Sequence, residues 1–317
     1  MRNERFADFP MLENKRPFIF FGLLSLTLSG LQAANIADTM KDSVSAGSFP
    51  AANEIDANAG YVAGSKAHLG SADFGNVTEQ NSRVYYAMSH QLEEGTLLRL
   101  GVEWQRFTFG IPVQAPLPNL LQSVSMVLGA DLELTDQWLM RVEIEPGVYS
   151  DFQDISFDDV NSPLIVGFTY LVDENLQWFF GLSVNPRRSL PVLPGAGVRW
   201  KFADPWTLML VFPRPRFEYE ASKNIVLYLG GEIKGDTYKV AHNFGNPSGH
   251  PNLNNKTVDF TEIRLGAGFS WRVTPGINLD IDGGYMMYRQ FDFSAAGTSI
   301  DNNNLASYGQ IAIRGSF

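Results

Sequence analysis

The sequence has no cysteine among its 317 residues. This absence excludes disulfide frameworks, cysteine-ligated zinc, iron–sulfur clusters and a lipidated N-terminal cysteine. Basic residues are also few, because 24 Lys and Arg stand against 34 Asp and Glu, which gives a formal net charge of −10. Phosphate binding needs clustered Lys and Arg, so the composition argues against a nucleic-acid partner.

Long apolar runs are missing except near the N-terminus, where Lys15 and Arg16 precede the run from Phe18 to Leu28 and small residues follow at Ala33 and Ala34. This order is typical of a secretory signal peptide. A transmembrane anchor is the alternative, but a membrane-spanning helix needs about 20 apolar residues. We therefore predict a signal peptide over residues 1–33, with an extension over 1–10, a short periplasmic segment over 34–53 and one domain over 54–317.

After the signal peptide, short stretches alternate apolar and polar residues. Between 137 and 145 the even positions are apolar, from Trp138 to Ile144, while Arg141, Glu143 and Glu145 occupy odd positions. Such alternation is typical of strands with two different faces. A soluble β-sandwich also alternates, but several stretches here exceed the usual five or six residues of soluble strands and reach the 9 to 11 that a membrane strand requires.

The number of strands favours a barrel that spans a membrane. The connections between the predicted strands are short at one end of the barrel and longer at the other. We expect the longer connections at the outer end, over 66–80, 150–162, 187–194, 239–256 and 294–304. We predict an all-β fold, a single transmembrane antiparallel β-barrel of about 14 strands, within the range of bacterial outer-membrane barrels. Twelve strands is the alternative, because the hairpin at Pro213-Arg214-Pro215 is very tight. The predicted strands cover 54–65, 81–92, 96–109, 119–134, 137–149, 163–172, 176–186, 195–203, 206–212, 214–221, 224–238, 257–273, 276–293 and 305–317.

Five of the six tryptophans lie within a few residues of the short turns predicted at 93–95, 135–137, 173–175, 203–205, 222–224 and 274–276. Amphipathic rings collect where a membrane barrel meets the lipid headgroups, so these residues predict an interface girdle. The alternative is a set of tryptophans that cap a sandwich core. The predicted girdle consists of Trp138, Trp178, Trp200, Trp206 and Trp271.

The chain ends on an aromatic residue. Ile311, Ile313 and Phe317 share one face of the last predicted strand, with polar residues on the other. This ending resembles the C-terminal assembly signal of bacterial outer-membrane proteins, from which it departs at Gly315. The resemblance implies recognition by the barrel-assembly machinery.

A second resemblance covers Trp206 to Val240, where Phe-Pro-Arg-Pro-Arg at 212–216 is followed by Glu218, Tyr219 and Gly230-Gly231-Glu232. This stretch resembles a family of uncharacterised predicted outer-membrane β-barrels. The resemblance implies the barrel architecture and no activity.

On this interpretation the polar face of each strand lines the lumen, where charged groups pair across strands or face water. Candidates of both signs occur, and they either form a salt-bridged wall or set the selectivity of a pore. The lumen-lining candidates are Arg99, Glu103, Arg141, Glu143, Arg199, Glu232, Glu262, Arg264, Asp280, Asp282 and Arg314.

Catalytic chemistry has little support. The only histidines are His68, His90, His242 and His250, and Ser89 and His90 are strand neighbours on opposite faces, which cannot form a nucleophile–base pair. We predict no catalytic residue, no metal and no cofactor, and we expect that the protein is not an enzyme.

The predicted location is the cell outer membrane, with its lipid and lipopolysaccharide and a small-molecule solute as partners. The predicted function is a passive pore or transport channel for small solutes. The alternatives are a structural or surface-interaction barrel with a blocked lumen and, third, an outer-membrane enzyme.

Overall fold

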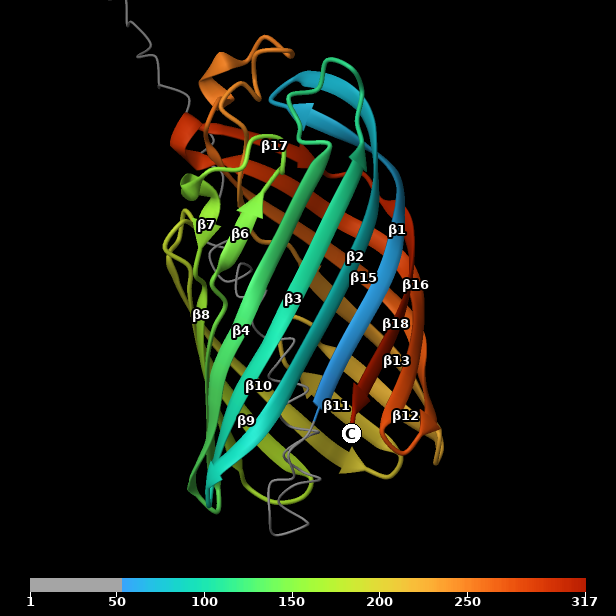
Figure 1. The fold of residues 1–317 in the computed structure, drawn as a ribbon. Helices are drawn as coiled ribbons and strands as arrows, with labels where there is room; N and C mark the ends of the chain where they lie inside the picture. Colours follow the sequence, from blue (N-terminus) through green and yellow to red (C-terminus); the bar gives the residue numbers. More distant parts are fainter. Residues whose placement is uncertain (1–52) are drawn as a thin grey trace, which may run out of the picture.

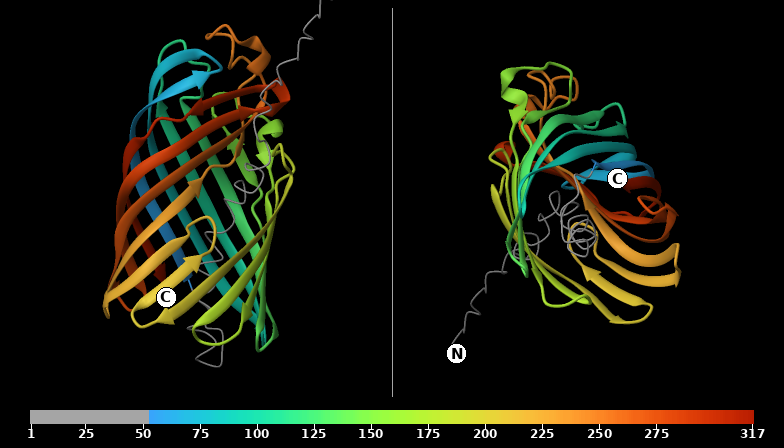
Figure 2. Two further views of the ribbon diagram at one scale, coloured as in Figure 1. Left: turned by 180° about the vertical axis from the view of Figure 1, so that it is seen from behind. Right: turned by 60° about the horizontal axis from the view of Figure 1, so that its bottom comes forward.

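The protein folds as a closed antiparallel β-barrel of 14 strands, which confirms the predicted fold class. The computed structural model describes residues 53–317, so the predicted signal peptide and residues 34–52 lie outside the described residues. Eighteen strand segments form the sheet, and four of them (β6, β7, β14 and β17) prolong a neighbouring segment, which leaves 18 − 4 = 14 strands. Figures 1 and 2 show how these strands lean across the wall and surround one interior.

The sheet closes because the last strand pairs with the first. Glu54 in β1 faces Ser316 in β18, and the backbone N–H groups of Asn53 and Phe317 each donate to the other residue's carbonyl, at 2.7 and 3.0 Å. The first seven segments in chain order are β1 (Asn53–Leu69), β2 (Ala72–Glu93), β3 (Thr96–Gly110), β4 (Leu120–Thr135), β5 (Trp138–Ile144), β6 (Gly147–Ser150) and β7 (Val160–Asn161). Then follow β8 (Leu164–Leu171), β9 (Leu176–Val184), β10 (Val192–Ala203), β11 (Trp206–Leu210), β12 (Arg216–Ser222), β13 (Ile225–Lys234), β14 (Thr237–Lys239), β15 (Thr257–Thr274), β16 (Ile277–Phe293), β17 (Thr298–Asn302) and β18 (Ala306–Ser316).

Three short 3-10 helices occur in the connections, at Phe157–Asp159, Pro251–Leu253 and Ser294–Ala296. Within residues 53–317, no helix is long and apolar enough to cross a membrane.

The two ends of the barrel differ. At the turn end, only two residues (94–95, 136–137, 204–205, 223–224 and 275–276) or four (172–175) join neighbouring strands. At the opposite loop end, longer connections join them at 111–119, 151–159, 185–191 and 240–256. The predicted outer connection over 66–80 is wrong, because β1 and β2 continue to a tight turn between Leu69 and Ala72. Some inward side chains within residues 66–80 are as small as that of Ala67. The sequence therefore shows no strong alternation of polar and apolar residues in this part of β1 and β2.

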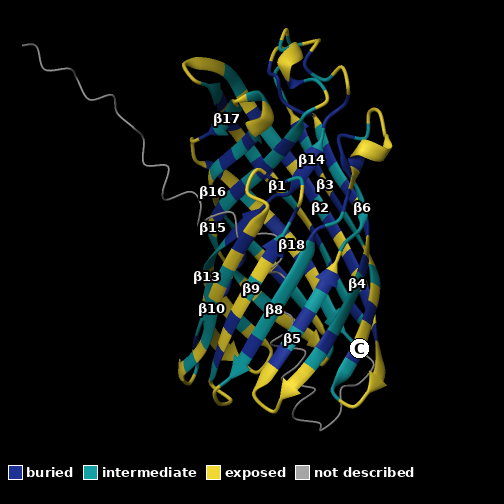
Figure 3. Ribbon diagram, turned by 90° about the vertical axis from the view of Figure 1, so that its left-hand side faces the viewer, coloured by how far each residue is buried: buried dark blue, intermediate teal, exposed yellow. Residues whose placement is uncertain are grey.

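Side chains alternate between the two faces of the wall, as the burial pattern in Figure 3 shows. On β3, Leu98, Leu100 and Val102 are exposed outward, at 38%, 51% and 57%. Leu97 and Arg99 on the other face are buried. The outer surface is therefore an apolar band, and the polar side chains collect inside.

An apolar cluster fills part of the interior at the loop end. Phe260 is at its centre, with ring centroids 4.8 Å from Phe107, 5.3 Å from Phe109 and 5.1 Å from Phe291. We call this set the loop-end cluster. Its buried members are Ala67, Val77, Phe107, Phe109, Ala115, Leu117, Leu121, Tyr149, Tyr238, Val240, Leu253, Val258, Phe260, Phe291, Phe293 and Ile300.

Deleting Phe317 should impair assembly of the barrel. Its backbone supplies the final pair of hydrogen bonds between β18 and β1, so the deletion leaves the sheet edge unpaired at the turn end. We expect a lower yield of the heat-modifiable folded band in outer-membrane fractions. Phe317→Leu is the control because it keeps the backbone pair, and a normal folded yield from the deletion would contradict the prediction.

Candidate functional site

The five girdle tryptophans lie on the outer surface near the turn end. Their side chains are partly exposed, from 36% for Trp138 and Trp206 to 48% for Trp200. Other outward aromatic rings accompany them: Trp138 lies 4.8 Å from Tyr170, and Trp206 lies 4.6 Å from Tyr219. These rings form an aromatic row beside the short turns, and its place at the headgroup level stays a prediction.

The strand register places the lumen-lining candidates on the inner face. Most are nearly inaccessible, including Glu143, Glu262 and Arg264 at 0%, Arg99 at 1% and Arg141 at 2%. Bringing charges out of water is costly unless opposite charges and hydrogen bonds compensate. The interior is therefore organised into ion-paired groups.

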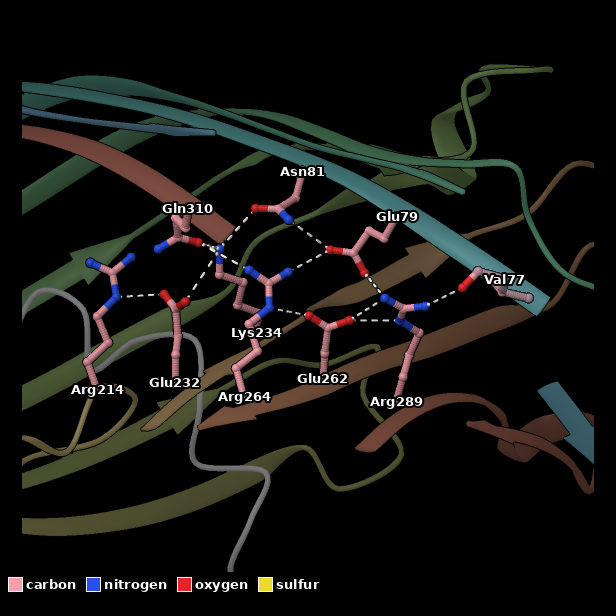
Figure 4. Close-up of polar contacts among 10 residues, drawn as sticks. All are labelled: Val77, Glu79, Asn81, Arg214, Glu232, Lys234, Glu262, Arg264, Arg289 and Gln310. Carbon is pink, nitrogen blue, oxygen red and sulfur yellow. Dashed lines mark hydrogen bonds and ion pairs between the residues drawn. The ribbon is translucent and has the colours of Figure 1, made fainter. Parts of the chain in front are cut away.

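The most deeply buried group links β2 with β16 and β15, which lie three and four strands away around the barrel. Glu79 on β2 accepts from Arg264 on β15 at 2.9 Å and faces Arg289 on β16 at 2.8 Å. Glu262 accepts from Arg289 at 2.7 Å and also pairs with Arg264. We call these residues the four-charge cluster (Figure 4). Two carboxylates and two guanidinium groups give it no net charge, and all four residues are 0% exposed.

Polar contacts extend this cluster toward β13. Arg264 donates to the Gln310 side chain at 3.2 Å, and Lys234 donates to Gln310 and, at 3.0 Å, to Asn81. Lys234 also lies 3.5 Å from Glu232, whose other oxygen accepts from Arg214 at 2.6 Å (Figure 4). The network thus runs across the interior from β2 to the loop between β11 and β12.

A second group lies nearer the turn end. Arg99 donates to both oxygens of Glu54 at 2.7 Å and to the Tyr85 hydroxyl at 2.7 Å. It also lies 3.4 Å from Glu143. Arg141 donates to Asp131 through two nitrogens at 2.5 and 2.6 Å. Arg99 and Arg141, predicted separately, therefore belong to one ion-paired wall over β1 and β3 to β5.

The remaining candidates form smaller contacts. Glu103 accepts from Arg83 at 2.7 and 2.9 Å. Asp280 pairs with Arg314, whereas Asp282 lies 3.4 Å from the Tyr228 hydroxyl. The two aspartates on successive inward positions of β16 thus have different partners. Arg199 lies on the inner face of β10, opposite Gln177.

Glu79 and Arg289 are cluster members that the alternation did not reveal. Glu79 fell in the wrongly predicted outer connection. Arg289 is at an odd position, and on β16 the inward residues Asp280 and Asp282 are even. The pairing with β15 shifts by one residue, from Arg264 opposite Met286 to Ile263 opposite Tyr288, which turns the odd positions inward beyond this point. A charged residue at an odd position, where the preceding odd residues of β16 are mostly apolar, was the sequence signal that Arg289 faces inward.

One part of the inner wall carries glycines where its neighbours carry charges. Asp131, Arg141, Gly167, Gly181 and Gly195 face one another in register across β4, β5, β8, β9 and β10. Among residues 53–317, a Cβ atom added at Gly167 would meet no heavy atom within 4 Å, and one at Gly181 would meet the Val166 carbonyl oxygen at 3.6 Å. We call Gly167, Gly181 and Gly195 the glycine row. Gly167 and Gly181 therefore leave room for further atoms on the inner face of β8 and β9.

The family of the chain follows from a match over most of the barrel. Residues 98–301 match the family described as Domain of unknown function (DUF6268). The chain belongs to this family. The DUF6268 match runs from β3 to β17 and includes the glycine row and most of the four-charge cluster. No curated protein matches the chain.

Several solved structures have a similar course of the chain. The NanC porin is 13% identical with a TM-score of 0.38, over 82% of this chain and 98% of that one. An outer membrane channel from Pseudomonas putida F1 is 9% identical with a TM-score of 0.43, over 84% and 96%. A deltaS2S3 mutant of the monoaromatic hydrocarbon channel TodX is 7% identical with a TM-score of 0.44, over 84% and 91%. Similarities this low concern the fold of this DUF6268 barrel alone.

Proposed function

We propose that the protein is a transport channel for small solutes in the cell outer membrane. The glycine row is the observation that carries this proposal. Charged and aromatic side chains fill the interior along β1 to β5 and β13 to β18, whereas Gly167 on β8 and Gly181 on β9 have room beside them for further atoms. Glycine weakens a strand because it has no side chain to pack. Three glycines in register therefore favour a function in which a solute needs space beside the wall.

The outer-membrane location rests on the outer surface. It is an apolar band with an aromatic row at the end that carries the short turns, and bacterial outer-membrane barrels have short turns at the periplasmic end. The loop end then faces the outside of the cell. The solute passes along the β8 to β10 side of the lumen, opposite the four-charge cluster.

Gly167→Trp should reduce flux through the protein strongly. The indole would project into the space beside the glycine row and narrow the path. The measurement is the rate at which arabinose swells proteoliposomes, together with the single-channel current in planar bilayers.

Gly309→Trp is a matched control. A Cβ atom at Gly309 also meets nothing within 4 Å, but this residue pairs with the exposed Tyr61 on the lipid-facing side of β18. Flux should be unchanged in this variant. Equal flux through both folded variants and the native protein would contradict a path along the glycine row.

A structural barrel with a blocked lumen is the second candidate, and the loop-end cluster favours it. The cluster closes part of the loop end with fully buried apolar side chains. Absence of arabinose swelling, of ionic current and of apolar-probe uptake in the native protein would favour this second function.

A further inference from the structure

The barrel wall is interrupted above the hairpin of β11 and β12. These strands have only 5 and 7 residues, far fewer than their neighbours. β10 pairs with β9 from Val192 onward but pairs with β11 only from Val198. In the part of the chain that the structure describes, the stretch of β10 before Val198 has no strand partner on this side.

The loop that ends the hairpin attaches to the other side of this interruption. The backbone N–H groups of Gly231 and Ile233 on β13 donate to the carbonyls of Pro215 and Pro213, both at 2.9 Å. The buried ion pair between Arg214 and Glu232 adds a side-chain contact at 2.6 Å. Residues 211–215 therefore prolong the sheet along β13 and leave the gap beside β10.

A cavity of about 770 Å³ occupies this gap. Its wall is mainly apolar and comes from both edges of the gap and from the lipid-facing surface of β15 and β16. Leu265 and Met287 in this wall are 51% and 42% exposed, so the cavity is continuous with the apolar band. The principal apolar lining residues are Pro194, Ala196, Phe212, Pro215, Leu265 and Met287.

The gap lies at the depth of the hydrocarbon. Pro194 is six residues before the girdle residue Trp200 on β10. Six residues of a strand tilted by about 40° rise roughly 15 Å along the barrel axis, within an apolar band about 25 Å tall. Unpaired backbone groups of a sheet edge are tolerated at this depth only where protein covers them or where water reaches them. The edge of β10 before Val198 is therefore expected to be reached by water from the lumen.

The lumen side of the gap carries an apolar contact beside the paired charges Glu232 and Arg264, which also line the cavity. Phe179 and Val211 are buried against each other, with Met209 beside them. Gly195 both ends the glycine row and lines the cavity. The space proposed for the solute and the gap in the wall thus meet at one residue.

We propose that this gap is a lateral opening through which an apolar small molecule passes between the lumen and the hydrocarbon of the membrane. The proposal rests on the proposed function and names its substrate class. The loop-end cluster agrees with this class, because an apolar solute crosses an apolar constriction at less cost than an ion does.

The test closes the opening from its lipid side. Ala196 is exposed outward in the cavity wall, so the indole of Ala196→Trp would fill the gap without entering the lumen. The probe is N-phenyl-1-naphthylamine, which fluoresces in hydrocarbon, added to intact cells with a lipopolysaccharide outer leaflet. We expect native protein to accelerate probe uptake and Ala196→Trp to abolish the acceleration. Arabinose swelling of proteoliposomes should be the same for both proteins.

Ala267→Trp is the matched control, because Ala267 is exposed on the same lipid-facing surface outside the cavity. It should keep native uptake. Pro194→Trp is a second closing variant in case Ala196→Trp fails to give a heat-modifiable band.

The remaining outcomes would overturn the lateral opening. One such outcome is probe uptake at the native rate by a folded Ala196→Trp or Pro194→Trp variant. Another is a loss of probe uptake in Ala267→Trp equal to that in the closing variant. Arabinose swelling by native protein without accelerated probe uptake would overturn the opening and leave the proposed function intact. Transport of neither solute would remove the proposed function itself.

Discussion

Arg289→Met should lower the free energy of unfolding by about 3–5 kcal/mol, because removing one partner of a buried ion pair leaves an uncompensated charge. Arg289 contacts Glu79 at 2.8 Å and Glu262 at 2.7 Å, and none of these side chains reaches solvent. Without it, two buried carboxylates share the single guanidinium of Arg264. The measurement is urea unfolding of the purified barrel in detergent micelles, followed by tryptophan fluorescence.

A second substitution separates the buried charge from lost packing. Glu79→Gln combined with Arg289→Met leaves one carboxylate, Glu262, opposite Arg264 and should recover most of the lost stability. Arg106→Ala is the control for removing an arginine, because Arg106 is exposed on β3 and donates to Thr108 at 3.2 Å. A loss for Arg289→Met no larger than that for Arg106→Ala would contradict the stabilising role of the cluster.

Phe260→Ala should both destabilise the barrel and increase its ionic current. Truncating a buried phenylalanine to alanine costs about 3–5 kcal/mol, depending on how far the surroundings collapse. Phe260 contacts the rings of Phe107, Phe109 and Phe291, so its loss opens a space at the centre of the loop-end cluster. Single-channel recordings should show a larger conductance than the native protein.

Phe269→Ala is the control on the same strand. Phe269 is 37% exposed on the lipid-facing side of β15, so its truncation should leave the current unchanged. A current in Phe260→Ala no larger than in the native protein would show that the loop-end cluster does not limit conduction.

Much of the inner wall could be predicted from alternation alone. Arg99, Arg141 and Glu143 follow the period of two on regular strands, and the structure places them in ion-paired groups on one face. The same alternation also places Phe107 and Phe109 inward, on the face of Arg99. The apolar loop-end cluster was not predicted, because the pattern within one strand does not show which rings of distant strands pack together inside the barrel.

The pairing of individual charges could not be predicted. Asp280 and Asp282 are equivalent in the sequence pattern, yet Asp280 pairs with Arg314 and Asp282 lies beside Tyr228. Partners are set by the register between strands and by the curvature that brings side chains of β2 within reach of those of β15 and β16. Neither is encoded within a single strand.

The sequence by itself determined that the chain forms long two-faced strands, about fourteen in number, with short turns at one end, because side-chain direction in a strand depends only on local alternation. Only the tertiary structure decided that β1 and β2 continue through residues 66–80, that a register shift turns Arg289 inward, and that the short β11 and β12 leave a gap beside β10. These features depend on hydrogen bonds between strands. Such bonds join residues distant in the chain, so closure of the barrel fixes them.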